Sequence, residues 1–542
     1  MNSTTQNLIE VSSASLYTPI VLVALCAAIG SSFYLSSKTG SQVKDVPSPP
    51  GASFFWGHQK IVFDASVGLV YARWFESLES SIVRIRAALW KPDILVISDP
   101  AAISYLLNKN IYNYPHSDVS RPRIERLLGR SLGWVEGDTE HKRMRQLFIP
   151  SFSNEAVRDR AQSIYGAAET LRENVAKALQ NDTGEVAIDI TEWMQSATLD
   201  ALGRFAFDHD FVGGKSEEAL EILYSWRNMA SVAISPMGFY GLMLLRRFPF
   251  LNRLPIPVIQ SQGNVRRTIH AGLAKNLLKR NEALLDSIDS SNEQGDLLLE
   301  LTKAYRAGFI GRDELMDHVV MFTISGSETT AQGLSYALWE MAKNPDLQNR
   351  LREELNTVGT EPSYDDIQSG LPYLDAVTRE VLRLHPPTPY MERNATKDDI
   401  IPLLKPFPGK DGKLNSEIFV KTGQTIIIPM HTVNRLNSVW GDGTTFRPDR
   451  WLSKLRSNFP PNELLTGGWS NIMTFSDGPR ICTGYRFAVF EFKLFLATLI
   501  RSFEFIDTGV KIVDKSASTM NPLVVGREAE GPMLPIRIRA VP

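Results

Sequence analysis

The stretch FSDGPRICTGYRFA (residues 475–488) contains Cys482, one of only two cysteines in a chain of 542 residues. The other, Cys26, lies in a separate apolar run, so a disulfide framework is not expected. Gly478 and Gly484 omit side chains where the backbone must turn or approach a large flat group closely. From Gly484 onward, the apolar run GYRFAVFEFKLFLATLI predicts a buried helix. The sequence therefore places a single thiol at the start of a buried helix.

The neighbours of Cys482 favour a thiolate. Amide N–H groups and the dipole at a helix N-terminus lower the pKa of a thiol. Arg480 adds a cation two residues away, and Phe475 adds an apolar cover. A cysteine that serves only as a small buried hydrophobe is the alternative. Taken together, these neighbours predict a ligand for a large flat cofactor.

Four motifs occur in the order found in one enzyme family. The stretch fits Phe-x-x-Gly-x-Arg-x-Cys-x-Gly at every defined position and resembles the haem-binding loop of the cytochrome P450 family. Three other segments resemble motifs of that family, namely SGSETT (325–330) in its long central helix, EVLR (380–383) as Glu-x-x-Arg, and FRPDRW (446–451) as Pro-Glu-Arg-Phe. The resemblance implies a cytochrome P450-like fold, mainly α with a smaller β-sheet part, in a single large catalytic domain.

The resemblance also implies a haem b cofactor whose iron has Cys482 as its axial thiolate ligand. The segment HKRMR (141–145) resembles a Trp-x-x-x-Arg helix, with a histidine whose protonation state becomes a variable in the tryptophan position. The cofactor-binding residues implied beside Cys482 are Phe475, Gly478 and Gly484 of the loop and the propionate partners Arg480, His141, Arg145 and Arg393.

Glu380, Arg383 and Arg450 are implied to form a buried ion-pair triad that supports the haem loop. Two neighbours depart from the pattern. Asp449 stands where the family usually has Glu, and Trp451 where it often has Phe. Because Arg450 itself is present, the triad is still expected.

Glu328 and Thr329 resemble the acid and alcohol that deliver protons during oxygen chemistry in this family. Ser325 and Thr329 are four residues apart and share a helix face, and Gly326 is expected to let the helix deform and leave room for dioxygen. The alternative is that these hydroxyls only bond back to a carbonyl of their own helix. The substrate-pocket candidates are Met321, Phe322, Ser325, Tyr390 and residues 114–132.

The N-terminal region predicts a membrane anchor. Residues 16–35 carry no charge over the length of one spanning helix, and no basic residue precedes Lys38, which disfavours a cleaved signal peptide. Lys38 and Lys44 place the chain beyond this apolar run in the cytosol. The expected layout is a short lumenal tail (1–15), a transmembrane anchor (16–35), a Pro-rich hinge (36–51) and a haem-binding catalytic domain (52–542), on the endoplasmic reticulum membrane.

Residues 140–355 read mostly as helices, residues 84–98 as two short strands around a turn, and KDGK (410–413) as a hairpin turn. The apolar segment 234–258 is interrupted by prolines and arginines, so a second membrane span is not expected. It is interpreted either as a buried loop or as a patch that dips into the membrane surface.

The net charge of −2 gives no support to a nucleic-acid partner. No flavin or dinucleotide fingerprint is visible, so the resemblance implies NADPH electrons from a separate cytochrome P450 reductase, docked near Lys142, Arg143, Arg486 and Lys493. The function expected is a monooxygenase acting on a lipophilic small molecule, a terpenoid or other secondary metabolite by resemblance to fungal microsomal members. The alternatives are a haem-thiolate isomerase or dehydratase, and a haem sensor or lipid-binding protein without turnover.

Overall fold

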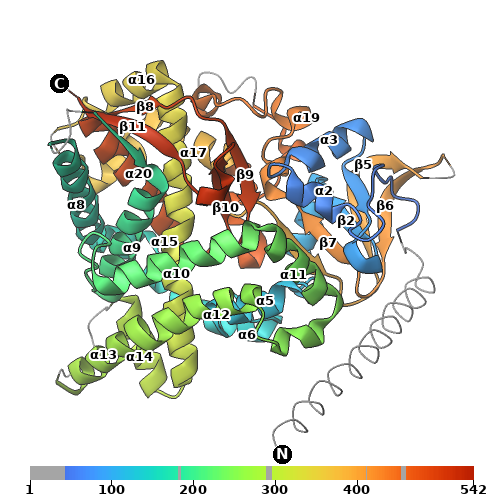
Figure 1. Cartoon of the computed structure of the whole chain (residues 1–542), viewed down its shortest axis with the longest axis horizontal. Helices are drawn as coiled ribbons and strands as arrows, with labels where there is room; N and C mark the ends of the chain where they lie inside the picture. The colour runs from blue at the N-terminus through green and yellow to red at the C-terminus, as the bar shows by residue number, and fades with distance from the viewer. Residues whose placement is uncertain are drawn as a thin grey trace, which may run out of the picture.

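The computed structural model of the chain describes residues 43–180, 185–287, 296–359, 361–409, 412–452 and 459–541. The predicted lumenal tail, the anchor and the first part of the hinge lie outside these residues. The described chain is mainly helical, with short strands gathered in small sheets beside the helices (Figure 1). This composition confirms the predicted fold class of a mainly α protein with a smaller β part.

The helices account for most of the described chain. They are α2 (Gln59–Asp64), α3 (Leu69–Ser77), α4 (Pro100–Ser104), α5 (Ser120–Leu128), α6 (Asp138–Phe148), α7 (Asn154–Asp159), α8 (Ala161–Gln180), α9 (Ile190–Phe207), α10 (Glu217–Ile234), α11 (Pro236–Arg247), α12 (Pro257–Ile269), α13 (Lys275–Ser287), α14 (Leu297–Arg306), α15 (Arg312–Lys343), α16 (Pro345–Leu355), α17 (Pro372–Leu384), α18 (Met430–Val433), α19 (Asn437–Trp440) and α20 (Tyr485–Ser502).

The strands form a four-stranded sheet, a three-stranded sheet and two hairpins. They are β1 (Ile82–Ile85), β2 (Ile94–Ile97), β3 (Glu185–Asp189), β4 (Met391–Asn394), β5 (Asp399–Pro408), β6 (Leu414–Val420), β7 (Thr425–Ile428), β8 (Phe503–Asp507), β9 (Ile512–Ser516), β10 (Met520–Val524) and β11 (Pro535–Ala540).

The largest sheet has the strand order β1-β2-β7-β4, in which β2 and β7 are parallel and the other pairs antiparallel. The antiparallel pair β1–β2 confirms the two strands predicted in residues 84–98, and the antiparallel pair β5–β6 confirms the predicted hairpin. Because β7 pairs with β2 and β4 pairs with β7, this sheet joins residues 82–97 to residues 391–428.

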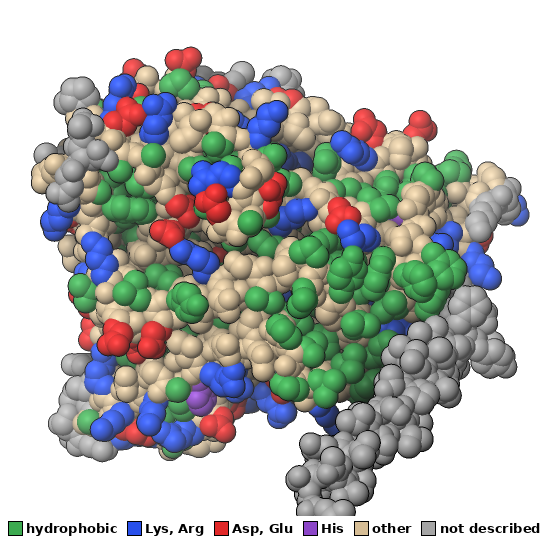
Figure 2. Space-filling view, in the orientation of Figure 1, with side chains coloured by type: hydrophobic (Ala, Val, Ile, Leu, Met, Phe, Trp, Pro, Cys, Tyr) green, Lys and Arg blue, Asp and Glu red, His purple; other side chains and the backbone are tan. Residues whose placement is uncertain are grey.

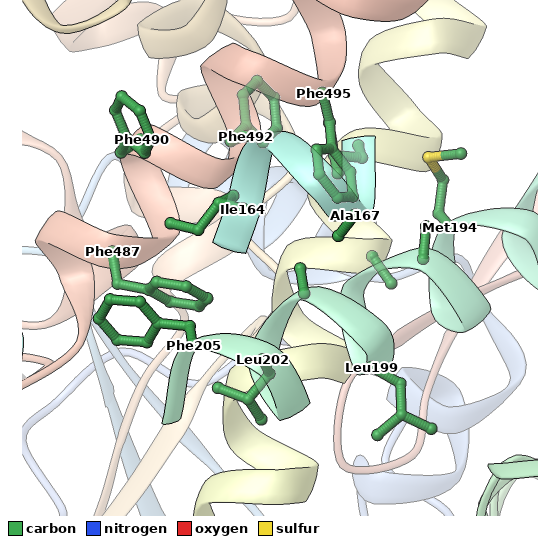
Figure 3. Packing of buried hydrophobic residues seen from close by; sticks show 14 of the residues in the cluster. Ile164, Ala167, Met194, Leu199, Leu202, Phe205, Phe487, Phe490, Phe492 and Phe495 are labelled. Carbon is green, nitrogen blue, oxygen red and sulfur yellow. The ribbon is translucent and has the colours of Figure 1, made fainter. Parts of the chain in front are cut away.

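The core is built around α15, which packs against α9 and α20. Aromatic rings from α20 fill the space between these helices and α8, as Figure 3 shows. Phe205 of α9 and Phe487 of α20 are stacked, with ring centroids 4.4 Å apart, an arrangement that adds to their burial energy. This packing fixes α20, and therefore the loop that precedes it.

The apolar segment 234–258 is not the loop that one interpretation expected. Ser235 ends α10 and caps α11, where Pro236 occupies the first turn. Phe239 and Met243 are buried, but other apolar side chains of this region are exposed, namely Met237, Tyr240, Leu244, Phe250 and Leu254.

Among the described residues, no single helix is long and apolar enough to cross a membrane. α10 and α11 together meet the requirements of length and composition, but they are bent by 77° where they join.

Candidate functional site

The loop before α20 holds Cys482 in a turn that closes on itself. The backbone N–H of Cys482 donates to the carbonyl oxygen of Phe475 at 2.9 Å. Gly478 has a φ of +66°, and a Cβ there would lie 2.3 Å from the carbonyl oxygen of Leu107. Only glycine fits this position without displacing backbone. α20 begins at Tyr485, directly after the loop, which confirms the predicted helix start.

Gly484 has no such constraint from the protein. Its φ of −90° is open to other residues, and a Cβ there would meet nothing closer than the ring of Phe152 at 3.6 Å. That is an ordinary van der Waals distance. The protein therefore leaves room beside Gly484 for a further group.

The thiol of Cys482 is not closed off by the protein. Its side chain is exposed to molecules of solvent size, yet protein atoms surround it closely enough that burial raises the pKa of the thiol. The amide N–H of Gly484 and the guanidinium of Arg145 act in the opposite direction and lower this pKa. The groups that favour a thiolate are thus the helix start predicted from the sequence and an arginine from α6.

Arg145 clamps the loop on both sides of Cys482. Its Nη1 donates to the carbonyl oxygen of Ile481 at 2.7 Å and to the hydroxyl of Thr483 at 3.1 Å. The resemblance implied that Arg145 binds a propionate. The structure uses its guanidinium, at least in part, to hold the backbone of the thiol loop.

Arg393 and Arg480 form a buried cationic pair in which some donors lack acceptors. Nε and Nη1 of Arg393 and Nε of Arg480 are buried and have no hydrogen-bond partner among the described residues. Burial and the nearby charge of Arg480 lower the pKa of Arg393 to about 10. Buried donors without acceptors are costly, so this pair fits an anionic group such as the two carboxylates of haem.

Glu136 is the carboxylate that faces this pair, and no motif in the sequence had singled it out. Nη2 of Arg480 donates to Glu136 at 2.7 Å and to the carbonyl oxygen of Val135 at 2.9 Å. Burial opposes its charge, but a hydrogen bond from His116 and the charge of Arg480 hold the pKa of Glu136 at about 2. Burial keeps the pKa of His116 at about 4, so that imidazole is neutral at pH 7. Arg480 therefore supplies the positive charge that Glu136 needs.

His141 is also neutral at pH 7. It is buried, and Nδ1 lies 3.0 Å from the hydroxyl of Tyr112. Burial and the nearby cations Arg480 and Arg145 lower the pKa of His141 to about 4. The protonation state that the sequence left open is thus set by desolvation and by like charge.

The expected triad is present as three contacting side chains. Glu380 accepts from Nη2 of Arg383 at 2.8 Å and from Nε of Arg450 at 2.9 Å, and all three side chains are buried. The indole N–H of Trp451 also donates to Glu380, at 2.9 Å. Asp449 instead pairs with Arg350 at the surface. The two departures from the family pattern therefore differ, because Trp451 joins the buried cluster and Asp449 does not.

On α15, the predicted acid Glu328 and the predicted alcohol Thr329 have different hydrogen-bond partners. Glu328 is buried and accepts hydrogen bonds from Gln195, Gln332 and Thr519. The hydroxyl of Thr329 donates to the carbonyl oxygen of Ser325 at 2.8 Å, which is the helix back-bond named as the alternative. No hydrogen bond joins Glu328 to Thr329, both of which the structure describes. Burial raises the pKa of the Glu328 carboxyl.

Gly326 lies where α15 packs on α9, and the helix is not deformed there as the sequence led us to expect. A Cβ at this position would lie 2.6 Å from the Leu202 side chain of α9. The glycine therefore permits close packing of α15 on α9, and α15 runs as a helix from Arg312 to Lys343 without a break.

A cavity of about 140 Å³, here called the α11 cavity, lies among α2, α11, the segment before β4, and the β9–β10 hairpin. Its lining includes the predicted pocket residue Tyr390, and it also includes Arg123 from the predicted stretch 114–132. Met321, Phe322 and Ser325 do not line it.

The three other pocket candidates lie elsewhere on α15. Phe322 is buried and stacks on Phe152 with ring centroids 5.5 Å apart, so it belongs to the aromatic core. Met321 is buried near Gly133. Ser325 is exposed on the helix face that bears Thr329.

The prediction that four basic residues meet a reductase is wrong for one of them. Lys493 is buried and pairs with Asp375 at 2.7 Å, so it cannot form part of a docking surface. The sequence did not show this because a lysine on a helix is usually exposed. Lys142, Arg143 and Arg486 are at least partly exposed.

The comparisons with known proteins agree with this geometry. Residues 47–528 match the family model named Cytochrome P450. The chain is 32% identical over 523 residues to cytochrome P450 monooxygenase claW of Ampulloclitocybe clavipes, covering 92% of this chain and 93% of the relative. It is 30% identical over 530 residues to cytochrome P450 monooxygenase 128 of Postia placenta, covering 92% and 93%.

The family model spans most of the chain, and the relatives match over nearly their whole length. The arrangement of the site points the same way, since an accessible thiol shares its loop with Arg480, and Arg480 and Arg393 carry buried donors without acceptors among the described residues. The chain therefore belongs to the cytochrome P450 family and is an oxidoreductase whose haem iron has a cysteine thiolate ligand.

Proposed function

We propose that this protein is a monooxygenase that inserts one oxygen atom from dioxygen into a lipophilic small molecule, with Cys482 as the axial ligand. The observation that carries the proposal is the accessible thiol of Cys482 in the same loop as Arg480, whose buried Nε, like Nε and Nη1 of Arg393, has no hydrogen-bond partner among the described residues. When bound, haem supplies the redox-active iron on which oxygen chemistry in this family depends.

The chain's own residues favour the anionic form of the sulfur against the burial that raises its pKa. Arg145 places a cation near it and fixes the backbone at Ile481 and Thr483, while the amide of Gly484 donates toward it. Hydrogen bonds to a charged acceptor are about twice as strong as neutral ones. In this proposal Phe475 covers the sulfur. Gly478 and Gly484 have no side chains that would keep a flat group from approaching the loop.

The carboxylates of the cofactor are assigned to the cationic pair. Arg393 and Arg480 offer buried donors without acceptors, and His141 offers a neutral imidazole on α6. Glu136 and His116 hold Arg480 from the other side. In this proposal Arg145 acts mainly through the thiol loop.

The triad supports the loop through a chain of hydrogen bonds. Nη1 of Arg383 donates to the carbonyl oxygen of Asn434 at 2.8 Å. The side chain of Asn434 in turn accepts from the backbone N–H of Met473 at 2.8 Å and donates to the hydroxyl of Thr474 at 3.2 Å. Since Thr474 directly precedes Phe475, the triad fixes the start of the thiol loop. This favours a structural role for Glu380, Arg383 and Arg450.

Thr329 and Glu328 are assigned to proton delivery, with unequal support. Thr329 lies on the open face of α15 with Ser325. Its hydroxyl would have to break only one hydrogen bond, the one to the backbone carbonyl of Ser325. Glu328 would have to leave three hydrogen bonds, each worth about 1 kcal/mol. The geometry therefore favours Thr329 as the group nearest the reaction, with Glu328 as a neutral acid held behind it.

The redox partner is proposed to be an NADPH-dependent cytochrome P450 reductase. Lys142 and Arg143 lie on α6, the helix that also supplies Arg145, and Arg486 lies in the first turn of α20. These two helices flank the thiol loop, so their exposed cations would bring an acidic electron donor close to the sulfur.

Membrane attachment is proposed with the layout expected from the sequence: a lumenal tail (1–15), an anchor (16–35), a hinge (36–51) and a cytosolic catalytic domain (52–542) at the endoplasmic reticulum. Support comes from exposed apolar side chains that gather over the α11 side of the molecule (Figure 2). They are Phe54, Phe55, Met237, Tyr240, Leu244, Phe250 and Leu254. A patch of this kind is typical of a surface that meets a membrane or a partner.

A terpenoid or other secondary metabolite is the substrate class proposed from the resemblance. The walls of the α11 cavity are mostly apolar, which supports a lipophilic ligand. The alternatives, an isomerase or dehydratase and a sensor without turnover, require no dioxygen.

The test is turnover of a lipophilic substrate by the purified protein with a reductase, NADPH and isotopically labelled dioxygen. We expect one labelled oxygen atom in each product molecule. Product formed without dioxygen or reductase would establish the isomerase class instead. Binding of ligands with no consumption of NADPH would establish the sensor.

A further inference from the structure

Four charged side chains line the α11 cavity, and three of them are cations. They are Arg123, Arg246, Lys515 and the single acid Glu392. The rest of the wall is largely apolar, with side chains such as Val62, Phe239, Leu242, Met243, Val258 and Ile427. An apolar chamber with excess positive charge is unusual, because unpaired charge is costly to bury.

Two of the cations already have partners. Arg246 forms a buried ion pair with Glu392, whose other carboxylate oxygen accepts from the hydroxyl of Ser117. Lys515 donates from Nζ to three backbone carbonyl oxygens, those of residues 63, 64 and 65. Both cations are therefore already engaged, although Nε of Arg246 is buried without a partner among the described residues.

Arg123 is different. Its single hydrogen bond is from Nη2 to the hydroxyl of Ser518 at 3.0 Å, and no carboxylate among the described residues lies within ion-pair distance of it. Protein surrounds the guanidinium, and burial lowers its pKa. It lines the cavity as a cation whose hydrogen-bond partner among the described residues is neutral.

The turn that holds Arg123 also reaches α15. Ser518 accepts from Arg123, and the next residue, Thr519, donates to Glu328 at 3.2 Å. The β9–β10 turn thus links the α11 cavity to the segment of α15 assigned to proton delivery. The turn therefore lies between Arg123 and Glu328, although no residue of α15 lines the cavity itself.

We propose that Arg123 binds the carboxylate of an amphiphilic substrate whose lipophilic body fills the α11 cavity. The inference rests on the proposed function and adds the chemical class of its substrate. A planar guanidinium with several N–H donors suits a carboxylate, and a water-poor setting strengthens such a pair. An ester or alcohol of the same skeleton offers no charge to compensate the cation.

The test is isothermal titration calorimetry of the haem-loaded enzyme at neutral pH with matched acids and methyl esters. The probes are dodecanoic acid and abietic acid, each beside its methyl ester. We expect at least one acid to bind about tenfold to a hundredfold more tightly than its ester, the range for a hydrogen-bonded charge pair. In Arg123→Gln that preference should vanish, and in Arg123→Lys part of it should return.

Arg130→Gln is the matched control, because Arg130 follows α5, loses the same charge, and is paired with Glu125 at the surface. The acid preference should persist there. Haem content and the circular dichroism spectrum of each variant show whether it has folded, and Arg123→Lys tests the charge if the glutamine variant does not fold.

Three results would overturn the inference. They are esters binding as tightly as acids throughout the panel, an acid preference that survives in Arg123→Gln, and full displacement of the acid by inorganic sulfate, which would indicate a small-anion site. Calorimetry needs no turnover, so its outcome is separate from that of the monooxygenase assay. An intact acid preference without oxygen insertion would contradict the proposed function alone.

Discussion

The indole N–H of Trp451 donates to the Glu380 carboxylate at 2.9 Å, inside a cluster that is almost fully buried. Trp451 stands where the family often has phenylalanine, so this chain adds a donor to the carboxylate that Arg383 and Arg450 share. The pKa of Glu380 is lowered, since Arg383, Arg450 and the backbone N–H of Arg447 outweigh the burial that opposes its charge.

The first prediction concerns this bond. Trp451→Phe keeps the aromatic ring but leaves a buried charged acceptor with one donor fewer, which costs about 1.5–3 kcal/mol. The urea midpoint, followed by haem absorbance, should fall accordingly. Asp449→Asn is the control, because its surface pair with Arg350 is worth about 1 kcal/mol or less. Equal midpoints for the two variants would contradict the role of Trp451.

Substitution of the two loop glycines by alanine should have different effects. Gly478→Ala puts a methyl group 2.3 Å from the Leu107 carbonyl in a left-handed backbone, so the variant should lose stability. Gly484→Ala meets no close protein atom, so its apoprotein should fold normally while haem binding weakens. Thermal unfolding of the apoproteins and haem titration check both. Full haem affinity in Gly484→Ala would show that the cofactor does not use this space.

Thr329→Ala should uncouple electron consumption from product formation. Loss of a positioned proton donor slows its step by about 10²–10⁴-fold, so NADPH oxidation should continue while hydrogen peroxide replaces product. Glu328→Gln should have a smaller effect, because the acid is held away from the open face of α15. Product and peroxide per NADPH are the measurements.

Ser325 offers a second hydroxyl on the face that bears Thr329. The double variant Ser325→Ala with Thr329→Ala should therefore be more uncoupled than either single variant. An unchanged product yield in the double variant would exclude a hydroxyl relay at this position, and a larger effect in Glu328→Gln would make the acid the primary donor.

Glu491 of α20 should make stability depend on pH. Its carboxyl oxygens are buried without a hydrogen-bond partner among the described residues, and burial raises its pKa well above the usual range. The nearby hydroxyl of Thr330 acts to lower this pKa, but burial is the larger effect. The folded protein therefore holds the proton on Glu491 at pH values where the unfolded chain has lost it.

Linkage between proton binding and folding sets the sign of this effect. As pH rises above the unfolded pKa of about 4.3, the unfolded chain releases this proton and the folded state is progressively disfavoured, until the pH passes the folded pKa. Glu491→Gln removes this penalty, so its stability advantage over the wild type should grow between pH 5 and 8. Urea midpoints at several pH values measure it, and a constant difference across that range would show that Glu491 is not protonated in the folded state.

The sequence was sufficient for the parts of the site that lie close together in the chain. The helix after Cys482 and the Glu380–Arg383 pair follow from i, i+3 spacing and from motif order, and both are present. The β1–β2 pair likewise follows from a short turn between apolar runs. Local spacing predicts local contacts well.

Contacts across the fold were not predictable in the same way. Glu136 meets Arg480 across 344 positions, and Arg123 meets Ser518 across 395, so no sequence pattern joins them. The sequence also did not show which side of a long helix a given side chain faces. Glu328 and Thr329 are neighbours in sequence, yet one is buried among glutamines and the other faces the open side. Burial of Lys493 depends on Asp375 of another helix in the same manner.

The central claim is that the Cys482 thiolate is the axial ligand of the haem iron. The most direct test is the absorption spectrum of the reduced carbon monoxide complex of Cys482→Ser, compared with Cys26→Ser and the wild type. We predict that the thiolate-type Soret band is lost in Cys482→Ser and fully retained in Cys26→Ser. A Cys482→Ser protein that keeps the thiolate-type band with its full complement of haem would contradict this assignment.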